Sequence, residues 1–247
     1  MRMQSDASFC FRTFPSQSRR CRLENLGLWA VVNNAGINSM CGPDDWCSLE
    51  DYKRSLDVNT LGVIRVCHAF KPLIKKSRGR FVTMTSIAGH CVLPFSGPYS
   101  VSKYALEAYM DTLRLELACF GVKCCVLEPS AFRTLFLDED AANHRIDAAW
   151  SRTSEVIQNE YGFEAKENFK KEFNEMMRKH SSSKTEIVTN AYIHALTARY
   201  PKLRYRCGFA AQFQLAPMSH LPTEITDLII QMCGMCGIDQ AVGRLNQ

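Results

Sequence analysis

The stretch LWAVVNNAG, residues 28–36, decides the fold, because an apolar run stops there at a turn of small and polar residues. Such a run is typical of a strand buried on both faces of a parallel sheet. Residues 49–76 then place apolar side chains about 3.6 positions apart, as on one face of a helix. Lys75, Lys76 and Gly79 close this segment, as at a helix C-terminus. We therefore expect a strand followed by one long helix.

The alternation of strand and helix continues along the chain. Residues 80–85 are rich in β-forming side chains, residues 99–118 have helical periodicity, and residues 122–127 form a third apolar run that ends at Pro129. Since parallel strands need crossover connections, this order predicts an α/β fold with a parallel sheet. Beyond Phe136 we expect helices over 164–179 and 187–196, an edge strand within 203–210, and a last helix over 221–232.

Composition indicates a soluble globular protein, with 247 residues, 46% hydrophobic and 22% charged. Residues 1–22 supply +4 of the formal charge of +5, so the rest of the chain is nearly neutral and offers no basic face for nucleic acid. This arginine-rich N-terminal segment resembles a mitochondrial transit peptide in composition. The alternative is a disordered or substituted N-terminus. No apolar run is long enough to span a membrane.

The 12 cysteines have no regular spacing, which favours reduced thiols in a cytosol-facing protein over a disulfide scaffold. Cys233 and Cys236 form one C-x-x-C pair, which fits a redox pair or half of a zinc site. Because no second pair lies nearby, we predict no metal site.

Tyr99 and Lys103 are the first candidates for chemistry. They are four residues apart near the start of the predicted second helix, so they share one face about one turn apart. A phenol has a pKa of about 10, and a neighbouring ammonium lowers it. The pair is therefore a candidate acid/base, although the same spacing also arises by chance in many helices.

Two further polar residues follow in consistent chain order. Ser86 comes just after a predicted strand, at the edge where open α/β sheets bind ligands, and its hydroxyl can hold a substrate oxygen. Asn59 lies inside the first predicted helix, where asparagine is a poor helix former. A water held by Asn59 would relay protons to Lys103.

Taken together, Asn-Asn-Ala-Gly at 33–36, Asn59, Ser86 and Tyr-x-x-x-Lys at 99–103 resemble the motifs of the short-chain dehydrogenases/reductases. The stretches GRFVTMTSIAG, YSVSKYALEAYMDTLRLEL and FGVKCCVLEPSAFRT look most like the retinol and 17β-hydroxysteroid dehydrogenase branch, with the 3-hydroxybutyrate dehydrogenases as close relatives. The resemblance runs from about Gly27 to Asp227. It implies a Rossmann-like doubly wound parallel sheet over residues 27–247, with a helical substrate cover at about 137–200.

The resemblance also implies roles for individual residues. Tyr99 would be the catalytic acid/base, Ser86 would orient the substrate, Asn59 would anchor the proton relay, and Lys103 would lower the pKa of the tyrosine and hold the nicotinamide ribose. The residues expected to contact the cofactor are Asn33, Ala35, Gly36, Tyr99, Lys103, Pro129 and Thr134. Ser130 stands where the family has glycine, so we expect its side chain to crowd the nicotinamide.

The glycine-rich turn that holds the dinucleotide phosphates in this family does not occur in the sequence. Only 26 residues precede Gly27, and one βαβ unit takes about 30. We therefore expect an N-terminally truncated sheet with an exposed apolar edge, preceded by a disordered or substituted segment at 1–26. The chain is then either an active oxidoreductase or a catalytically impaired member of the family that acts by binding a full-length relative.

For the active form, the resemblance implies NAD as the cofactor, with NADP as the alternative. The substrate would be a lipid-like alcohol or ketone, a hydroxysteroid or a retinol, with 3-hydroxybutyrate-type activity as the alternative. The branch also implies an endoplasmic reticulum membrane-associated or cytoplasmic protein, a possible homo-oligomer. Residues 221–235 would make any peripheral membrane contact, although Asp227 and Gln231 favour a packed amphipathic helix.

Overall fold

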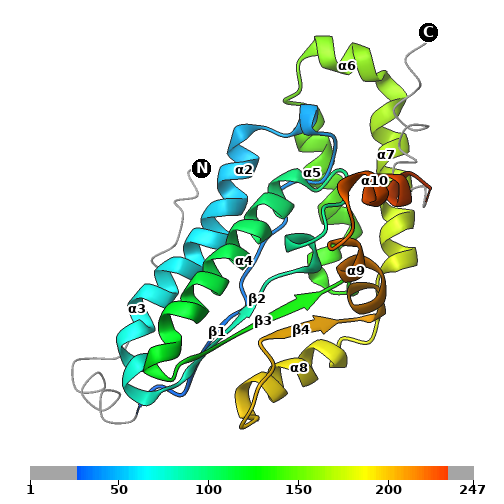
Figure 1. Cartoon of the computed structure of the whole chain (residues 1–247). Helices are drawn as coiled ribbons and strands as arrows, with labels where there is room; N and C mark the ends of the chain where they lie inside the picture. Colours follow the sequence, from blue (N-terminus) through cyan, green and yellow to red (C-terminus); the bar gives the residue numbers. More distant parts are fainter. Residues whose placement is uncertain (1–26, 233–247) are drawn as a thin grey trace.

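The computed structural model describes residues 27–232, which form a four-stranded parallel sheet in the order β1-β2-β3-β4 (Figure 1). The strands are β1 (Ala30–Asn33), β2 (Arg80–Met84), β3 (Lys123–Pro129) and β4 (Arg204–Cys207). Because all four run in one direction, their carboxyl ends meet at one edge of the sheet. The predicted parallel α/β fold is confirmed. The segment 1–26 and the pair Cys233 and Cys236 lie outside the described residues.

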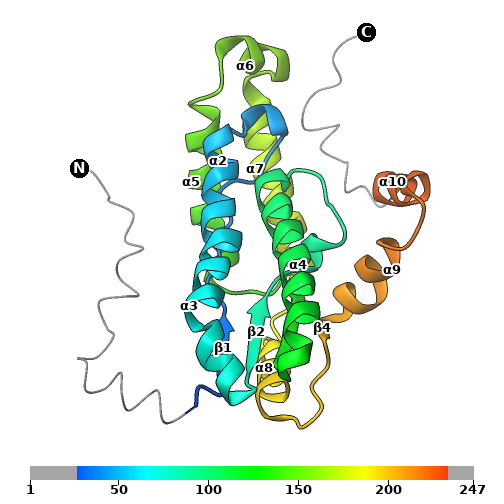
Figure 2. The ribbon, with the colours of Figure 1, turned by 60° about the vertical axis from the view of Figure 1, so that its left-hand side comes forward.

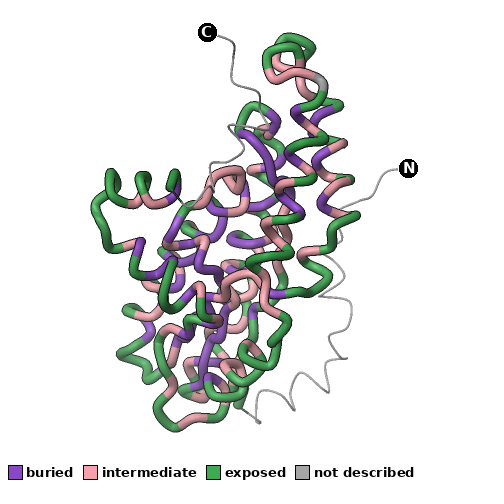
Figure 3. Tube along the Cα trace, turned by 90° about the vertical axis from the view of Figure 1, so that its right-hand side faces the viewer, coloured by how far each residue is buried: buried purple, intermediate pink, exposed green. Residues whose placement is uncertain are grey.

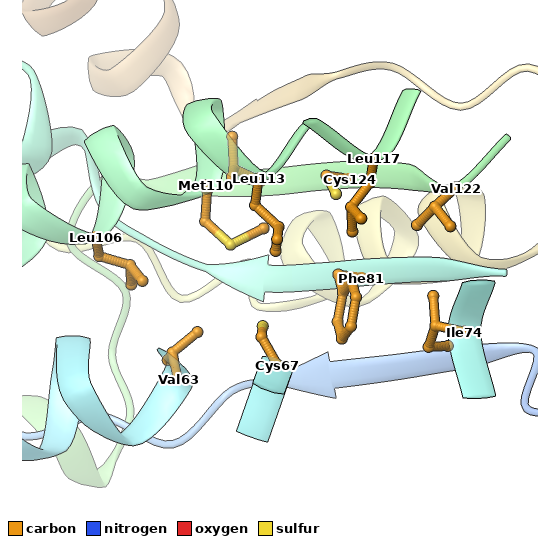
Figure 4. Close-up of a cluster of buried hydrophobic side chains, with 11 residues drawn as sticks. Val63, Cys67, Ile74, Phe81, Leu106, Met110, Leu113, Leu117, Val122 and Cys124 are labelled. Atoms are coloured by element: carbon orange, nitrogen blue, oxygen red, sulfur yellow. The ribbon is translucent and has the colours of Figure 1, made fainter. Parts of the chain in front are cut away.

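Helices cover both faces of the sheet. The helices α3 (Gly62–Ser77) and α4 (Gly97–Leu117) lie side by side on one face, and α8 (Glu186–Thr197) packs on the other (Figures 1 and 2). Side chains alternate along a strand, so Phe81 of β2 faces α3 and α4 while its neighbour Val82 joins the cluster on the α8 side. Figure 4 shows the first of these clusters, with Phe81 between side chains of α3 and α4.

The predicted helix over 49–76 is a chain of three segments. It begins as α2 (Leu49–Leu56), widens into a π-helical segment η2 (Asp57–Leu61), and continues as α3. A capping box between Ser48 and Asp51 starts α2, with each side chain accepting a backbone N–H of the other. The π segment was not foreseen, because apolar periodicity does not reveal one extra residue in a turn.

The helices predicted over 164–179, 187–196 and 221–232 are present with bounds within a few residues of these, and the other helical elements of this part of the chain were not predicted individually. The elements not yet named are η1 (Asp44–Trp46), η3 (Ile87–Gly89), η4 (Ala118–Phe120), η5 (Leu135–Leu137), α5 (Glu139–Trp150), α6 (Glu155–Tyr161), α7 (Phe163–His180), η6 (Ala210–Leu215), α9 (Ala216–Met218) and α10 (Thr223–Met232).

An extension formed by α5, α6 and α7 projects beyond the sheet, and its far end is exposed (Figure 3). Its base is held by aromatic packing: Trp46 makes edge contacts with Trp150 of α5 at 4.8 Å and with Phe169 of α7 at 5.5 Å between ring centres. An ion pair of 3.0 Å between Arg152 and Asp51 fastens the same junction. The predicted cover segment is thus anchored to the loop that follows β1.

In the described part of the chain, β1 has a neighbouring strand on one side only. The backbone oxygen of Trp29 accepts from Arg80 of β2, so the alternate residues Ala30 and Val32 direct their backbone groups to the open side. The Val32 side chain is 44% exposed. The predicted apolar edge is therefore present among residues 27–232.

A buried charge cluster ties β4 to the rest of the sheet. The Arg204 guanidinium donates to Glu107 Oε2 at 2.6 Å, to Asp111 Oδ2 at 2.6 Å, and to the fully buried Glu128 of β3. One side-chain atom each of His90, Glu107 and Glu128 lies within 4.8 Å of the others, as metal ligands would. Arg204 Nη1 lies within hydrogen-bond distance of all three atoms, so a guanidinium fills the centre of this group.

The α4 face toward the sheet gives a matched test of the core. Leu113 is 1% exposed and Leu115, two residues later, is 68% exposed. We expect Leu113→Ala to lower the free energy of unfolding by about 2–5 kcal/mol because it leaves a cavity beside Phe81. Leu115→Ala should lower it by less than about 0.5 kcal/mol. Urea denaturation followed by circular dichroism measures both, and equal losses would contradict this packing.

The charge cluster gives a second test. We expect Arg204→Met to lower the free energy of unfolding by about 3 kcal/mol at neutral pH, because it takes the guanidinium away from the buried carboxylates of Glu107 and Glu128 and leaves His90 as their nearest cation. Arg206→Met, which removes only a 3.5 Å contact to Glu128, should cost less than about 1 kcal/mol.

The pH dependence has a definite sign. Burial alone raises the pKa of Glu128, but hydrogen bonds from His90 and Arg204 outweigh it and lower that pKa. The stability contributed by this carboxylate is therefore present at neutral pH and lost as the pH falls through its folded pKa. The deficit of Arg204→Met should shrink as the pH falls, and a deficit independent of pH would be inconsistent with carboxylate pairing.

Candidate active site

Three side chains predicted from sequence meet at the carboxyl edge of β2. Ser86 follows β2 and begins η3, Tyr99 lies in the first turn of α4, and Lys103 lies one turn later. The side chains of Ser86 and Tyr99 are hydrogen-bonded. Lys103 Nζ lies 5.5 Å from the centre of the Tyr99 ring and donates to the backbone oxygen of Met84 at 3.1 Å. The chain order predicted a site, and the fold brings these residues together.

The position of Ser86 depends on close contact between η3 and α4. A Cβ added at Gly89 would lie 2.9 Å from Glu107 Cγ and 3.0 Å from the backbone oxygen of Lys103. Only glycine allows the η3 turn to approach the helix so closely. The Ser86 hydroxyl also accepts from the backbone N–H of Ala88 at 3.2 Å, which starts that turn.

Burial controls the pKa values of the pair. It raises the pKa of Tyr99 to about 12, against an opposing effect of the Ser86 hydrogen bond. It lowers the pKa of Lys103 to about 8, against the favourable charge of Glu107. In the described structure the pKa of Tyr99 thus lies above its ordinary value because of burial, and the lowering of that pKa by Lys103 stays a prediction. Tyr99 is protonated at neutral pH and is a proton donor in this form.

Asn59 lies in the π-helical η2 and is fully buried. Its Nδ2 donates to the backbone oxygen of Ile37 and to Ser102 Oγ, both at 2.9 Å, and its Oδ1 accepts from the backbone N–H of Ile37 at 2.8 Å. Asn59 thus fastens the loop after β1 to α4. The sequence drew attention to Asn59 but not to Ser102, because a serine inside a helix carries no signal of its partner.

The residues of the Asn-Asn-Ala-Gly segment, 33–36, make different contacts. The Asn33 side chain is turned into the sheet, where it donates to Thr83 Oγ1 at 3.2 Å, so only its backbone is available to a ligand. A Cβ at Gly36 would lie 3.3 Å from Asn59 Oδ1 and 3.6 Å from Lys103 Nζ, so Gly36 leaves room beside the lysine. Ala35 is exposed at the same edge.

Pro129 ends β3 at this edge, and Thr134 is exposed just before η5. The expectation that Ser130 crowds a nicotinamide is not supported by its contacts. Ser130 Oγ donates to the backbone oxygen of Cys207 at 3.4 Å, and it lies close to Gly208, whose φ of 98° favours glycine. The serine side chain is therefore turned toward the end of β4.

A cavity of about 390 Å³ lies beside this group of residues. Phe136 of the cavity wall lies next to the site, with its ring centre 5.7 Å from that of Tyr99. The lining comes from the loop after β1, from η5, and from α5 and α7: Asn38, Cys41, Arg133, Thr134, Leu135, Phe136, Leu137, Asp138, Glu139, Ala142, Arg145, Phe173, Asn174, Met177, Arg178 and Ser181. The cover segment and the loop after β1 thus enclose a ligand-sized space that sequence reasoning did not locate.

The described residues fit one end of a dinucleotide. Lys103 lies beside both Tyr99 and Gly36, and this group could hold a nicotinamide and its ribose. Across residues 27–232, no glycine-rich turn joins a strand to a helix N-terminus in the way that holds a pyrophosphate. The described residues therefore fit the nicotinamide end of a dinucleotide.

Comparison with known proteins agrees with this geometry. Residues 17–145 match the family model of the short chain dehydrogenases. Relatives include a 3beta-hydroxysteroid dehydrogenase of Caenorhabditis elegans, 46% identical over 84% of this chain and 53% of its own length. Retinol dehydrogenase 7 of Rattus norvegicus is 38% identical, over 85% of this chain and 65% of its own. The chain thus spans roughly half to two thirds of the length of these relatives.

Solved structures share the fold at low identity. A short chain dehydrogenase/reductase from Burkholderia phymatum in complex with NAD has a TM-score of 0.58 and 20% identity, covering 85% of this chain and 73% of its own. A short-chain dehydrogenase from Streptomyces avermitilis has a TM-score of 0.57 and 18% identity, covering 89% and 75%. Motifs, fold and relatives agree, and the chain belongs to the short chain dehydrogenase family.

Proposed function

We propose that this chain is an NAD(P)-dependent oxidoreductase that interconverts an alcohol and a carbonyl on a lipid-like substrate. One observation carries the proposal: the Tyr99 hydroxyl is hydrogen-bonded to Ser86, with the Lys103 ammonium one helical turn away at the carboxyl edge of the sheet. A protonated phenol, a second hydroxyl and a buried cation are the groups needed to handle the charge on a carbonyl oxygen as it becomes an alcohol.

In carbonyl reduction, the Ser86 hydroxyl donates a hydrogen bond to the substrate oxygen and holds it beside Tyr99. A nicotinamide held at this edge would supply the hydride for the carbonyl carbon. Tyr99 donates its proton to the oxygen, and the Lys103 cation stabilises the phenolate that is left. Asn59 anchors the relay that returns a proton toward Lys103. Alcohol oxidation runs the same steps in reverse, with the phenolate accepting the hydroxyl proton.

The substrate class follows from the relatives and the cavity together. The relatives are named as a 3beta-hydroxysteroid dehydrogenase, retinol dehydrogenases and a 17-beta-hydroxysteroid dehydrogenase. A cavity of about 390 Å³ with Phe136, Phe173 and Met177 in its wall is of the size that takes lipid-like molecules. It is larger than a four-carbon hydroxy acid needs, which favours a steroid or retinol skeleton over 3-hydroxybutyrate.

We propose NAD as the cofactor, on the resemblance to this branch, with NADP as the alternative. The residues that would hold its nicotinamide end are Gly36, Tyr99, Lys103, Pro129 and Thr134, with backbone contacts from Asn33 and Ala35. The second candidate function, a catalytically impaired chain that binds a full-length relative, is supported by the open β1 edge.

A location at the endoplasmic reticulum membrane or in the cytoplasm fits the relatives' branch, and a homo-oligomer is part of the same proposal. Within residues 27–232, no helix is both long and apolar enough to cross a membrane. The residues of α10 that would support peripheral contact are Ile225, Leu228 and Met232, which are exposed.

Replacing the proton donor tests the proposed function. Tyr99→Phe should reduce turnover by about 10²–10⁴-fold, because the ring remains but the transferable proton is gone. Nicotinamide absorbance with a steroid alcohol and a retinol measures turnover. Isothermal titration of NAD and NADP should show nearly unchanged cofactor affinity. Tyr104→Phe, an exposed tyrosine on the same helix, is the control.

Two results would count against the active-enzyme proposal. Full activity in Tyr99→Phe would remove the tyrosine from its role. Absence of NAD and NADP binding to the parent chain at millimolar concentrations would favour the second candidate function.

The pH profile tests Lys103. Its ammonium is present below its pKa of about 8 and lost above it, while Tyr99 keeps its proton up to about 12. We therefore expect the rate of carbonyl reduction to fall as the pH rises through about 8. In Lys103→Arg the guanidinium stays charged, so the falling limb should move above pH 10 in whatever activity remains. If the rate of Lys103→Arg still falls as the pH rises through about 8, a group other than Lys103 causes that fall.

A further inference from the structure

The cavity beside Tyr99 contains more positive than negative side chains. Arg133, Arg145 and Arg178 line it, against the carboxylates of Asp138 and Glu139. Asp138 Oδ1 already accepts from the backbone N–H of Ala141 at 2.8 Å, where it caps α5. Glu139 pairs with Arg178 at 3.9 Å. The two carboxylates of the cavity wall therefore already have partners, and Arg133 and Arg145 have no carboxylate partner among the residues that the structure describes.

These two arginines differ in how they are held. Arg133 donates to Ser181 Oγ at 3.3 Å and to the backbone oxygen of Arg178 at 3.1 Å, so it has neutral acceptors. Arg145 is half-buried on α5 and has no hydrogen bond or ion pair with any residue of the described range 27–232. A partly buried guanidinium without an acceptor gains free energy when an anion binds to it.

Asn38 and Cys41 lie on the same cavity wall and add a second unpaired group. Asn38 Nδ2 lies 2.7 Å from Cys41 Sγ, while the buried Asn38 Oδ1 has no hydrogen-bond partner among the described residues. Burial raises the pKa of the Cys41 thiol, whereas the charge of Arg145 lowers it, which places the arginine near this pair.

The Cys41 thiol keeps its proton, so it can donate to Oδ1 when the Asn38 amide turns by half a rotation. Nδ2 then takes the buried position that Oδ1 has now, which is closed to the cavity. Arg145 is therefore the charged donor that this part of the wall offers a ligand.

Most of the remaining wall is apolar, and its other polar residues are Thr134, Asn174 and Ser181. Leu137, Phe173 and Met177 line the cavity, and Phe136 connects it to the Tyr99 ring. A ligand that fills this space needs an apolar body, a hydroxyl or carbonyl that reaches Tyr99, and an acceptor for Arg145.

We propose that the cavity takes an apolar hydroxy or keto acid, with Arg145 binding its carboxylate. The reacting end rests on the proposed function, whereas the carboxylate contact is a binding property that is measured without turnover. The predicted substrates are therefore lipid-like alcohols and ketones that carry an acid, in preference to their neutral counterparts.

The test compares two probes, a decanoic acid with a terminal hydroxyl and its methyl ester, by isothermal titration into the whole chain. The parent should bind the acid about tenfold more tightly, as one charge-assisted hydrogen-bonded pair provides. Arg145→Met should bind the two probes equally, and Arg145→Lys should keep most of the preference. Arg54→Met removes an exposed arginine outside the cavity and should leave the preference unchanged.

Thermal unfolding by circular dichroism confirms that each variant is folded. Equal binding of acid and ester by the parent, a preference that survives in Arg145→Met, or no binding of either probe would each overturn the inference. If the parent prefers the acid but turns over no alcohol, the proposed function fails while the carboxylate site stands.

Discussion

Burial of the Lys103 ammonium is the constraint on which the site depends. A cation taken out of water needs partners, and the described structure gives this one a backbone oxygen at the end of β2 and the negative field of Glu107 one turn further along α4. Glu107 is in turn held by Arg204 of the edge strand. The Lys103 charge is therefore linked through the Glu107 carboxylate to the edge strand β4.

Hydrogen bonds and close packing also fix the positions of the groups around Lys103. Asn59 makes all its hydrogen bonds to the loop after β1 and to α4, and so keeps Gly36 beside the lysine. Gly89 lets the turn that carries Ser86 lie against the helix that carries Tyr99. The spacing of Ser86, Tyr99 and Lys103 is therefore set by residues outside this group.

Local pattern was sufficient to predict the alternating strands and helices, because each buried strand is a short apolar run and each crossover helix keeps one apolar face. Ser86, Tyr99, Lys103 and Asn59 could also be found, since their order on consecutive units is improbable by chance. The direction in which the pKa of Tyr99 shifts could not be predicted, because it depends on how much solvent the fold excludes from the phenol. The orientation of Ser130, the Arg204 cluster and the cavity wall depend on contacts between residues far apart in the chain, which spacing does not encode.

The π-helical segment η2 has a consequence for the rest of its helix. Each residue of an α-helix turns the chain by about 100°, so the extra residue accommodated in η2 sets the rotational phase of everything after it. With that phase, Asn59 faces the loop after β1 while Val63, Cys67 and Ile74 face the sheet. A shortened segment would turn one of these two faces away from its partner. The orientation of Asn59 and the packing of α3 on the sheet thus depend on the same irregular turn. A deletion in η2 would therefore be tolerated far less well than a substitution.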